Sequence, residues 1–344
     1  MEINGIKKVD KSNMRKIILD FPKQFRIGVK AAKNVYLESW NFLVPPENII
    51  ICGMGASGLP GDILVTLRPL NVFVYKNYQL PPQAGNESLI ICVSYSGNTE
   101  EVLSSFQTAI NRHLSVISIT TGGELGRLSK KYNTPCVKLP PPLLPPRLAL
   151  GELFAALLQV LQNHNLLEKS LVEELLKVGS LRAEGFEAQG KKLVKKIFRK
   201  IPVIYTSRRF REIGWIWKNS LNETAKIIAF CNYFPELNHG GEIVGFDKIN
   251  EDQISNKKIC VLILRDKEGS YSRILKQMDI AKDLIEKEGV DVDFIDMEGK
   301  TFLEKIFSTI ILGFWTAYWL ALEYKVDPTP SGQIAEFKRR LAKV

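Results

Sequence analysis

Short apolar runs alternate with longer amphipathic stretches through the first half of the chain. The runs with the length and β-branched content of buried strands are residues 48–52, 71–76, 88–94, 114–120 and 134–139. The stretches between them have helical spacing. Strands that alternate with helices predict a parallel sheet with helices on both faces, and such sheets bind ligands at the carboxyl ends of their strands.

A proline cluster at residues 139–147 ends this alternation, because proline continues neither a helix nor a central strand. The pattern is then helical from Leu148 to about Leu176, and a basic stretch up to Lys200 is interpreted as a helical connector. The alternation resumes afterwards, with strands expected at 201–207, 257–265 and 290–297 and helices near 209–228, 271–288 and 301–325.

At 344 residues the chain is long enough for two domains. The pattern predicts one α/β design used twice. We expect an N-terminal domain over residues 1–160, a helical connector over 161–200 and a C-terminal domain over 201–344.

Composition is that of an ordinary globular protein, with 45% hydrophobic and 24% charged residues. The five cysteines lie far apart and lack the spacing of a metal site or a redox pair, so reduced core residues are expected. The N-terminal sequence lacks the apolar core of a secretory signal, which favours a cytoplasmic location.

Residues 306–322 contain no charged side chain and approach the length that spans a bilayer. Ser308, Thr309, Gly313 and Thr316 dilute the apolar character of this stretch. We therefore predict a buried helix and no membrane association.

The net charge of +10 could attract nucleic acid, acidic lipid or small anionic substrates. The densest basic runs, at 191–200 and 336–344, follow helical spacing and lack the interleaved aromatic residues of a platform for single-stranded nucleic acid. They are interpreted as solvated helix faces, and no nucleic-acid partner is predicted.

A glycine-rich loop, Gly53-Met54-Gly55-Ala56-Ser57-Gly58, follows the first predicted strand and leads into a helix. Its backbone N–H groups are suited to an anion. The loop also matches the dinucleotide fingerprint G-x-G-x-x-G. The next strand ends at Lys76 rather than at an acidic residue, which argues against NAD but leaves an NADP-binding oxidoreductase open.

A second polar loop, residues 94–101, follows the third predicted strand and also enters a helix. Ser94, Ser96 and Thr99 supply hydroxyl groups at the start of that helix, where a phosphate could bind without a cation. An ordinary turn with a helix cap is the alternative interpretation, with Glu100 and Glu101 complementing the helix dipole.

These two loops together resemble the sugar-isomerase (SIS) domain. Further segments resemble the bifunctional phosphoglucose/phosphomannose isomerases, and the likeness extends from Gly53 to Leu341. These segments are Pro146-Arg147, SLNETAK at 220–226, PELNHGGEIVGF at 235–246 and DPTPSGQIAEFKRRL at 327–341. The resemblance implies two SIS-type domains, each a parallel sheet between helix layers (αβα).

The resemblance implies a metal-independent, cofactor-free isomerase that interconverts glucose 6-phosphate, and mannose 6-phosphate, with fructose 6-phosphate through a cis-enediol. That reaction needs a base, a ring-opening group and positive charge near the enediolate. By resemblance, Glu223 is the base, Arg147 stabilises the enediolate and Lys338 assists ring opening. His239 would relay a proton to the ring oxygen, reaching into the neighbouring subunit's site in a homodimer.

Each of these residues also has an ordinary structural interpretation. Glu223 could be a solvated helix residue, and His239 a loop histidine that caps a carbonyl. Arg147 could pair with Glu152, and Lys338 could be one charge on an amphipathic helix.

Sugar-phosphate binding is implied for the two loops and for one small hydroxyl side chain near the C-terminus. The loop residues are Gly55, Ala56, Ser57, Ser94, Ser96 and Thr99. Ala56 stands where the family often has glycine, and its methyl group could crowd the backbone nearest the sugar. We expect the change to be tolerated, because alanine is the smallest change possible. Thr329 and Ser331 are both candidates for the hydroxyl that makes room for the mannose epimer, and Gln333 lies close to both.

Other function classes fit the sequence less well. A zinc-dependent phosphomannose isomerase would need clustered histidine and carboxylate ligands, and the chain has no paired histidines. A non-catalytic SIS sensor would not need Glu223, His239 and Lys338 together, and no DNA-binding motif is evident. An amino-sugar phosphate isomerase is a further alternative, although no glutaminase domain is present to supply ammonia.

Overall fold

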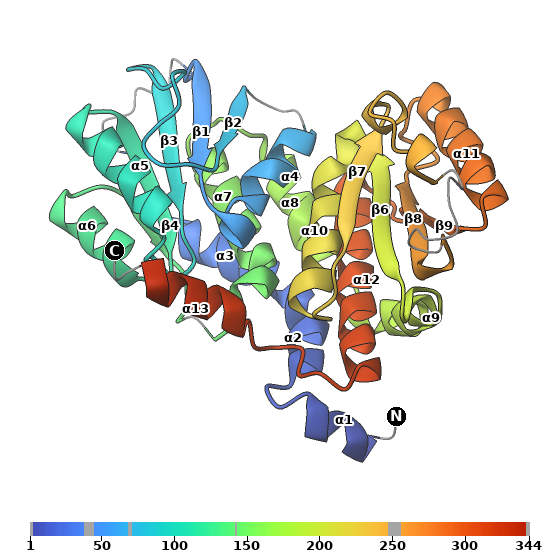
Figure 1. Cartoon of the computed structure of the whole chain (residues 1–344). Coiled ribbons are helices and arrows are strands. Elements are labelled where there is room, and N and C mark those ends of the chain that lie inside the picture. The colour runs from blue at the N-terminus through green and yellow to red at the C-terminus, as the bar shows by residue number, and fades with distance from the viewer. Residues whose placement is uncertain (1–2, 38–44, 68–70, 142, 247–255, 342–344) are drawn as a thin grey trace. The chain divides into compact units, whose positions relative to one another are not determined.

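The computed structural model describes residues 3–37, 45–67, 71–141, 143–246 and 256–341. The chain forms two compact units, one of residues 20–182 and the other of residues 1–19 with 183–344. Each unit contains a parallel sheet between helices, as Figure 1 shows. The predicted fold class, two three-layer α/β domains, is confirmed.

The sheet of residues 20–182 has the strand order β2-β1-β3-β4-β5, and every pairing is parallel. Its strands are β1 (Asn48–Cys52), β2 (Val72–Tyr75), β3 (Ser88–Val93), β4 (Ser115–Thr120) and β5 (Cys136–Lys138). Strands β1 and β3 are buried at every position because helices cover both faces of the sheet. All five strands predicted for this half are therefore found.

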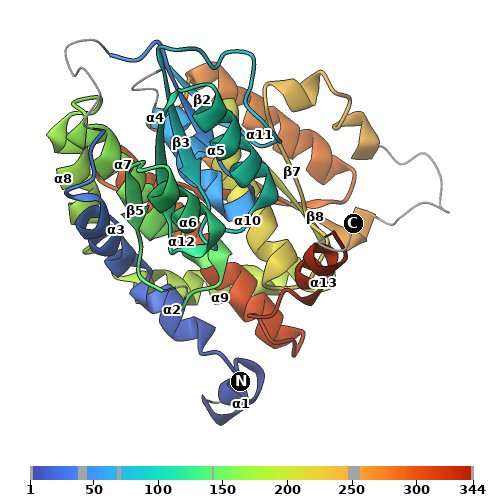
Figure 2. The ribbon, with the colours of Figure 1, turned by 90° about the vertical axis from the view of Figure 1, so that its left-hand side faces the viewer.

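Helices α5 and α6 cover one face of this sheet, and α3, α4 and α7 cover the other, as Figures 1 and 2 show. The helices of this unit are α3 (Gln24–Ala32), α4 (Leu59–Leu67), α5 (Glu100–Asn111), α6 (Gly123–Lys131), α7 (Leu150–Asn163) and α8 (Lys169–Val178). The stretch predicted as helical from Leu148 to Leu176 is thus two helices. Asn165, which has a φ of 54°, separates them, because a left-handed residue ends a helix.

The sheet of the other unit has the order β7-β6-β8-β9, again with parallel pairings. Its strands are β6 (Ile201–Ser207), β7 (Phe230–Phe234), β8 (Ile259–Arg265) and β9 (Asp291–Asp296). Strand β7 was not predicted from the sequence. The helix expected over 209–228 is α10 (Arg211–Glu223), which ends early because the chain turns at Lys226, with a φ of 59°, and enters β7.

Helices α10 and α12 pack on this second sheet opposite α11 (Figure 1). The helices of this unit are α1 (Ile3–Val9), α2 (Met14–Asp20), α9 (Glu187–Ile197), α10, α11 (Ser272–Lys287), α12 (Phe302–Glu323) and α13 (Gly332–Leu341). Within the described part of the chain, α12 alone is long and apolar enough to cross a membrane, and 94% of its apolar window is buried. The predicted buried helix is therefore confirmed.

The five cysteines are free thiols. Cys52, Cys92 and Cys260 are buried, and Cys136 and Cys231 are partly buried, as expected for reduced core residues. Burial raises the pKa of the Cys231 and Cys260 thiols to about 12, so both stay protonated near neutral pH.

Candidate active site

The glycine-rich loop after β1 turns sharply before α4 begins. Gly55 has a φ of +51°, in the left-handed region that favours glycine. A Cβ atom on Gly53 would lie 2.5 Å from the carbonyl oxygen of Ser57, so a side chain does not fit there. Ser57 is buried, and its Oγ accepts a hydrogen bond of 3.1 Å from the backbone N–H of Tyr95 in the second loop.

Lys76 at the end of β2 pairs with a buried carboxylate. Its Nζ lies 2.5 Å from Oδ2 of Asp62 on α4, whose side chain is 5% exposed. The charge of Lys76 is therefore partly neutralised by Asp62. The NADP interpretation needed the Lys76 charge to bind the 2′-phosphate of the cofactor. The pairing with Asp62 therefore argues against NADP binding.

The second loop places three hydroxyl groups before α5. Ser94 Oγ lies 2.9 Å from Thr99 Oγ1 and accepts a 3.1 Å bond from the N–H of Gly97. Thr99 stands at the N-cap of α5 without a side-chain capping bond, so the first-turn N–H groups have no cap from this residue. Ser96 is exposed, and its Oγ accepts a 3.3 Å bond from the N–H of Asn98.

Arg147 lies in the short turn Pro146–Leu148 directly before α7 and is only 8% exposed. This turn packs against the turn Gly55–Ser57 of the first loop. Gln24 on α3 also holds this turn. Its Nε2 donates to the Leu148 carbonyl at 2.7 Å, and its Oε1 accepts from the Gly151 N–H at 3.0 Å. The structure therefore brings Arg147 and both predicted loops together at one edge of the sheet.

A buried tyrosine–glutamate pair lies beside these loops and was not predicted from the sequence. Tyr95 and Glu152 are each 3% exposed, and each side chain shifts the pKa of the other. Burial raises the pKa of Glu152 to about 6, although the interaction with the Tyr95 side chain lowers it. Burial and the Glu152 carboxylate also raise the pKa of Tyr95. From the sequence, Glu152 was expected only as a possible ion-pair partner of Arg147.

Glu223 lines a cavity of about 800 Å³ in the unit that contains the second sheet. Ser331 and Gln333 line the same cavity, while Thr329 does not. The cavity lies between the end of α10, the start of β7 and the segment before α13; its lining is Trp215, Lys218, Asn222, Glu223, residues 226–231 and residues 330–334. Lys226 fixes this arrangement, since its Nζ donates to the carbonyl oxygens of both Glu223 and Pro330.

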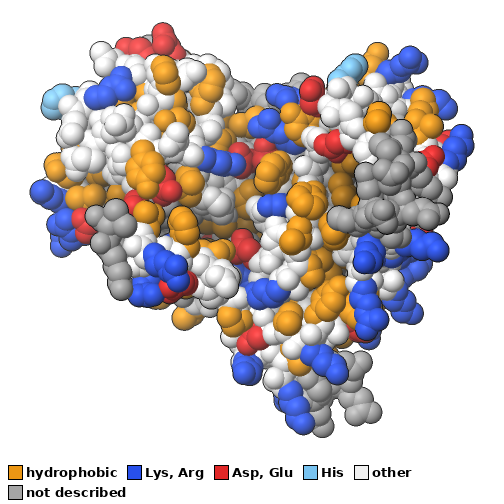
Figure 3. All heavy atoms as spheres, viewed as in Figure 1, with side chains coloured by type: hydrophobic (Ala, Val, Ile, Leu, Met, Phe, Trp, Pro, Cys, Tyr) orange, Lys and Arg blue, Asp and Glu red, His pale blue; other side chains and the backbone are white. Residues whose placement is uncertain are grey.

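The rim of this cavity is apolar. Trp215, Ile228 and Phe230 are 43%, 66% and 56% exposed, respectively. Figure 3 shows hydrophobic side chains along α10 and β7 on this face.

The structure does not bring His239 to the Glu223 cavity of the same chain. His239 is exposed and lies beyond the carboxyl end of β7, whereas Glu223 lies near the start of that strand. Five strand residues separate the two ends by about 15 Å. Lys338 is exposed on α13, a helix with no buried residues, and it does not line the cavity either.

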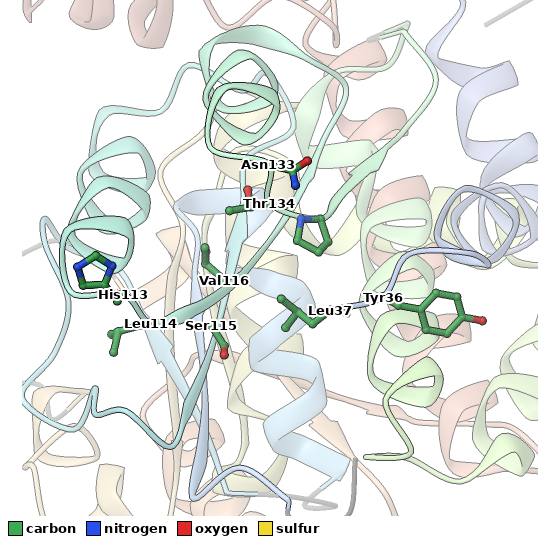
Figure 4. Close-up of a pocket in the computed structure, with 9 residues that line it drawn as sticks. Tyr36, Leu37, His113, Leu114, Ser115, Val116, Asn133 and Thr134 are labelled. Atoms are coloured by element: carbon green, nitrogen blue, oxygen red, sulfur yellow. The ribbon is translucent and has the colours of Figure 1, made fainter. Parts of the chain in front are cut away.

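Another cavity, of about 520 Å³, lies at the amino ends of β4 and β5 (Figure 4). Its lining residues are Tyr36, Leu37, His113, Leu114, Ser115, Val116, Asn133, Thr134 and Pro135. It is at the opposite end of the sheet from the two loops, and no predicted site residue lines it. Within the described ranges, no three His, Cys, Asp or Glu side chains are grouped to hold a metal ion.

Comparisons with known proteins point to one family. Residues 186–341 match the family model described as the bacterial phospho-glucose isomerase C-terminal SIS domain. A bifunctional phosphoglucose/phosphomannose isomerase of Aquifex aeolicus (strain VF5) is 31% identical over 306 residues, covering 88% of this chain and 92% of the relative. The enzyme of the same name from Caldicellulosiruptor bescii is 34% identical over 340 residues, covering 94% and 96%.

Solved structures agree on the fold. The crystal structure of a putative phosphosugar isomerase from Clostridium difficile 630 superposes with a TM-score of 0.67 at 16% identity, covering 94% of this chain and 97% of that one. A tagatose-6-phosphate ketose/aldose isomerase from Escherichia coli superposes with a TM-score of 0.64 at 16% identity, covering 91% and 93%. At these identities the likeness shows the fold alone.

Proposed function

The chain belongs to the family of bifunctional phosphoglucose/phosphomannose isomerases, and we propose that it interconverts glucose 6-phosphate and mannose 6-phosphate with fructose 6-phosphate. The observation that carries this proposal is 34% identity to such an enzyme over 94% of the chain. The predicted division at residues 160 and 200 and the predicted cytoplasmic location stay predictions.

The two loops of the first sheet are the proposed binding site for the phosphate and the sugar. Ser96 and Thr99 present hydroxyl groups at the start of α5, where the helix dipole and first-turn N–H groups favour an anion. Ser94 is buried, and its Oγ lies 2.9 Å from Thr99 Oγ1, so it would support Thr99 in this site. Gly55, Ala56 and Ser57 present backbone groups at the adjoining turn. Hydrogen-bond donors alone can hold a phosphate at such a helix end, so the proposed site needs no metal.

Glu223 is the proposed base. It would remove the proton from C1 of the open-chain ketose and deliver it to C2 of the enediol, or act in the reverse direction. Delivery to one face of C2 gives the glucose epimer and delivery to the other gives the mannose epimer. Arg147 would stabilise the enediolate, and its burial supports this role, because a charge acts more strongly away from water.

Ser331 is the proposed hydroxyl that leaves room at C2 for both epimers. Its position in one cavity with Glu223 supports this choice over Thr329, which does not line that cavity. Ser331→Gln would fill that room. We expect the variant to keep activity between the fructose and glucose phosphates and to lose activity towards mannose 6-phosphate.

A homodimer in which His239 serves the partner's site is also proposed, with Lys338 assisting ring opening. The separation of His239 from Glu223 along β7 supports this arrangement, because a proton donor must lie within about 3 Å of its target. In such a dimer, each site combines Glu223 of one subunit with the histidine of the other.

The experiment that tests the reaction uses chelator-treated protein, fructose 6-phosphate and product identification by NMR. Glucose and mannose 6-phosphates should both form. Glu223→Gln should lower kcat by about two to four orders of magnitude. Glu323→Gln, at the exposed end of α12, is the matched control and should retain wild-type turnover. Absence of product with the wild-type protein would refute the proposed activity.

Mixing two inactive variants tests the shared histidine. Refolding Glu223→Gln together with His239→Ala should restore about one quarter of wild-type activity, because half of the dimers are mixed and each has one intact site. If both groups came from the same chain, the mixture would stay inactive.

A further inference from the structure

The Glu223 cavity has two walls that come from distant parts of the sequence. One wall is the end of α10, which carries Glu223, and the other is residues 330–334, which include Ser331. Lys226 and Pro330, which join the two walls, are 104 residues apart in the chain. A sugar can meet the base and the Ser331 hydroxyl together only while the walls keep a fixed separation.

The side chain of Lys226 bridges these walls. Its Nζ donates a hydrogen bond to the carbonyl oxygen of Glu223, the last residue of α10. It donates a second bond to the carbonyl oxygen of Pro330, directly before Ser331. A charged donor makes stronger hydrogen bonds than a neutral one, and a positive charge complements the carboxyl end of a helix. One ammonium group therefore holds the backbone that carries the base and the backbone next to Ser331.

The backbone at Lys226 supports this bridge. Its φ of 59° is left-handed, which is uncommon for a lysine, and it turns the chain after α10. Within the same turn, Asn222 Nδ2 donates to the carbonyl oxygen of Ile227 at 2.8 Å. The Lys226 side chain thus starts from a backbone that is tied to α10, so its bond to Pro330 restrains the second wall relative to the first.

Two further hydrogen bonds shape the second wall from within. The N–H of Thr329 donates to Asp327 Oδ1 at 3.0 Å, and the N–H of Ala335 donates to the carbonyl oxygen of Ser331 at 3.1 Å. Neither bond sets the distance of this segment from α10. Residues 332–341, all of which the structure describes, include no buried side chain, so close packing contributes little to the position of α13. The bond from Lys226 does set that distance.

We propose that Lys226 is a positioning residue that sets the separation between the Glu223 base and the wall at residues 330–334, and thereby how the site accommodates substituents at C2. This inference rests on the proposed function, in which Glu223 moves the proton and Ser331 leaves room for both epimers. The ammonium group acts through the two carbonyl groups that it binds and not on the reacting carbons.

Lys226→Met keeps the length of the side chain and removes its charge and its hydrogen-bond donors. We expect kcat for fructose 6-phosphate to fall about threefold to tenfold, because a wall that moves orients the sugar less well. The KM should change by less than about twofold, because the proposed phosphate loops belong to the other unit. Lys226→Arg still offers donors to both carbonyl oxygens and should stay within about twofold of the wild-type kcat.

Lys325→Met is the matched control. Lys325 is also exposed, lies shortly after the end of a helix and has a left-handed φ of 58°, but it does not line the cavity. This variant should leave kcat and KM unchanged. A loss in Lys226→Met that Lys325→Met reproduces, or that Lys226→Arg also shows, would overturn the inference.

A double mutant with Ser331→Gln separates positioning from general loosening. Ser331→Gln alone should lose mannose 6-phosphate formation, because the glutamine fills the room at C2 only while the wall is held in place. Adding Lys226→Met should restore mannose 6-phosphate formation to at least about a tenth of its rate in Lys226→Met alone. No recovery, or an unchanged kcat in Lys226→Met alone, would overturn the inference. If the wild type forms neither aldose phosphate, the proposed function fails instead.

Amide hydrogen exchange provides a measurement that does not depend on activity. In Lys226→Met, the amide of Ala335 should exchange at least about threefold faster than in the wild type, because the segment that carries its acceptor is released. The amide of Val326, which donates to Ala321 on α12 at 3.0 Å, should exchange as in the wild type and so show that the unit is intact. Equal exchange at Ala335 in both proteins would overturn the inference even for a protein without isomerase activity.

Discussion

The buried carboxyl group of Glu152 makes the stability of its unit depend on pH. Burial raises its pKa from the ordinary value of 4.5 to about 6 in the folded protein. The folded state therefore prefers the protonated acid more than the unfolded chain does. The stabilisation from this group is fully present below about pH 4.5 and is lost as the pH rises through about 6.

Glu152→Gln isolates this effect, since glutamine has nearly the same shape, stays neutral and can still accept a hydrogen bond from Tyr95. The difference between the ordinary pKa of 4.5 and about 6 corresponds to about 2 kcal/mol. At pH 8, the variant should have a free energy of unfolding up to about 2 kcal/mol higher than the wild type. At pH 4.5, the two proteins should be nearly equal.

Urea unfolding followed by circular dichroism at pH 4.5, 6 and 8 measures this difference. Comparing the two proteins at each pH cancels the titration of all other groups. Glu87→Gln, an exposed residue in the same unit, is the control and should show no pH-dependent difference. A variant that is less stable than the wild type at pH 8 would refute the reasoning, because ionised Glu152 would then be stabilised by the fold.

Three further predictions concern the loops and the core. Ser96→Ala combined with Thr99→Ala should raise the KM for fructose 6-phosphate more than it lowers kcat. An unchanged KM would show that the phosphate binds elsewhere. Gly97→Ala should lower the midpoint of thermal unfolding, because φ is +74° and a Cβ would lie 1.9 Å from a backbone oxygen. Gly313→Ala in α12 should lower the free energy of unfolding, measured with urea, by about 1–3 kcal/mol, because its Cβ would lie 2.8 Å from Trp217 Nε1. An unchanged unfolding midpoint in either glycine variant would contradict the argument for that glycine.

The interior strands could be predicted from the sequence because parallel strands between two helix layers are apolar on both faces. Residues 48–52 and 88–93 are buried at every position and read as continuous apolar runs. Strand β7 gave no such signal. It lies at the edge of its sheet, where Phe230 is 56% exposed, and its central residue is Asn232.

The positions of the two loops could also be predicted, because polar residues directly after buried strands must gather at the carboxyl edge of a parallel sheet. Tyr95 and Glu152 could not. A glutamate on a helix normally faces water, and only the packing of α7 against neighbouring elements shows that Glu152 does not. The signal available in the sequence was the apolar content of residues 150–161, which leaves no solvated face for a charge.

Strand β7 lies between the two residues proposed for proton transfer. Glu223 precedes β7 and His239 follows it, and the strand between them is about 15 Å long. A base at C1 and C2 and a proton donor at the ring oxygen must act on atoms of one sugar. The separation along β7 is consistent with the proposed homodimer, in which the two groups come from different subunits. If that proposal holds, conditions that dissociate the dimer should abolish ring opening before they unfold the chain.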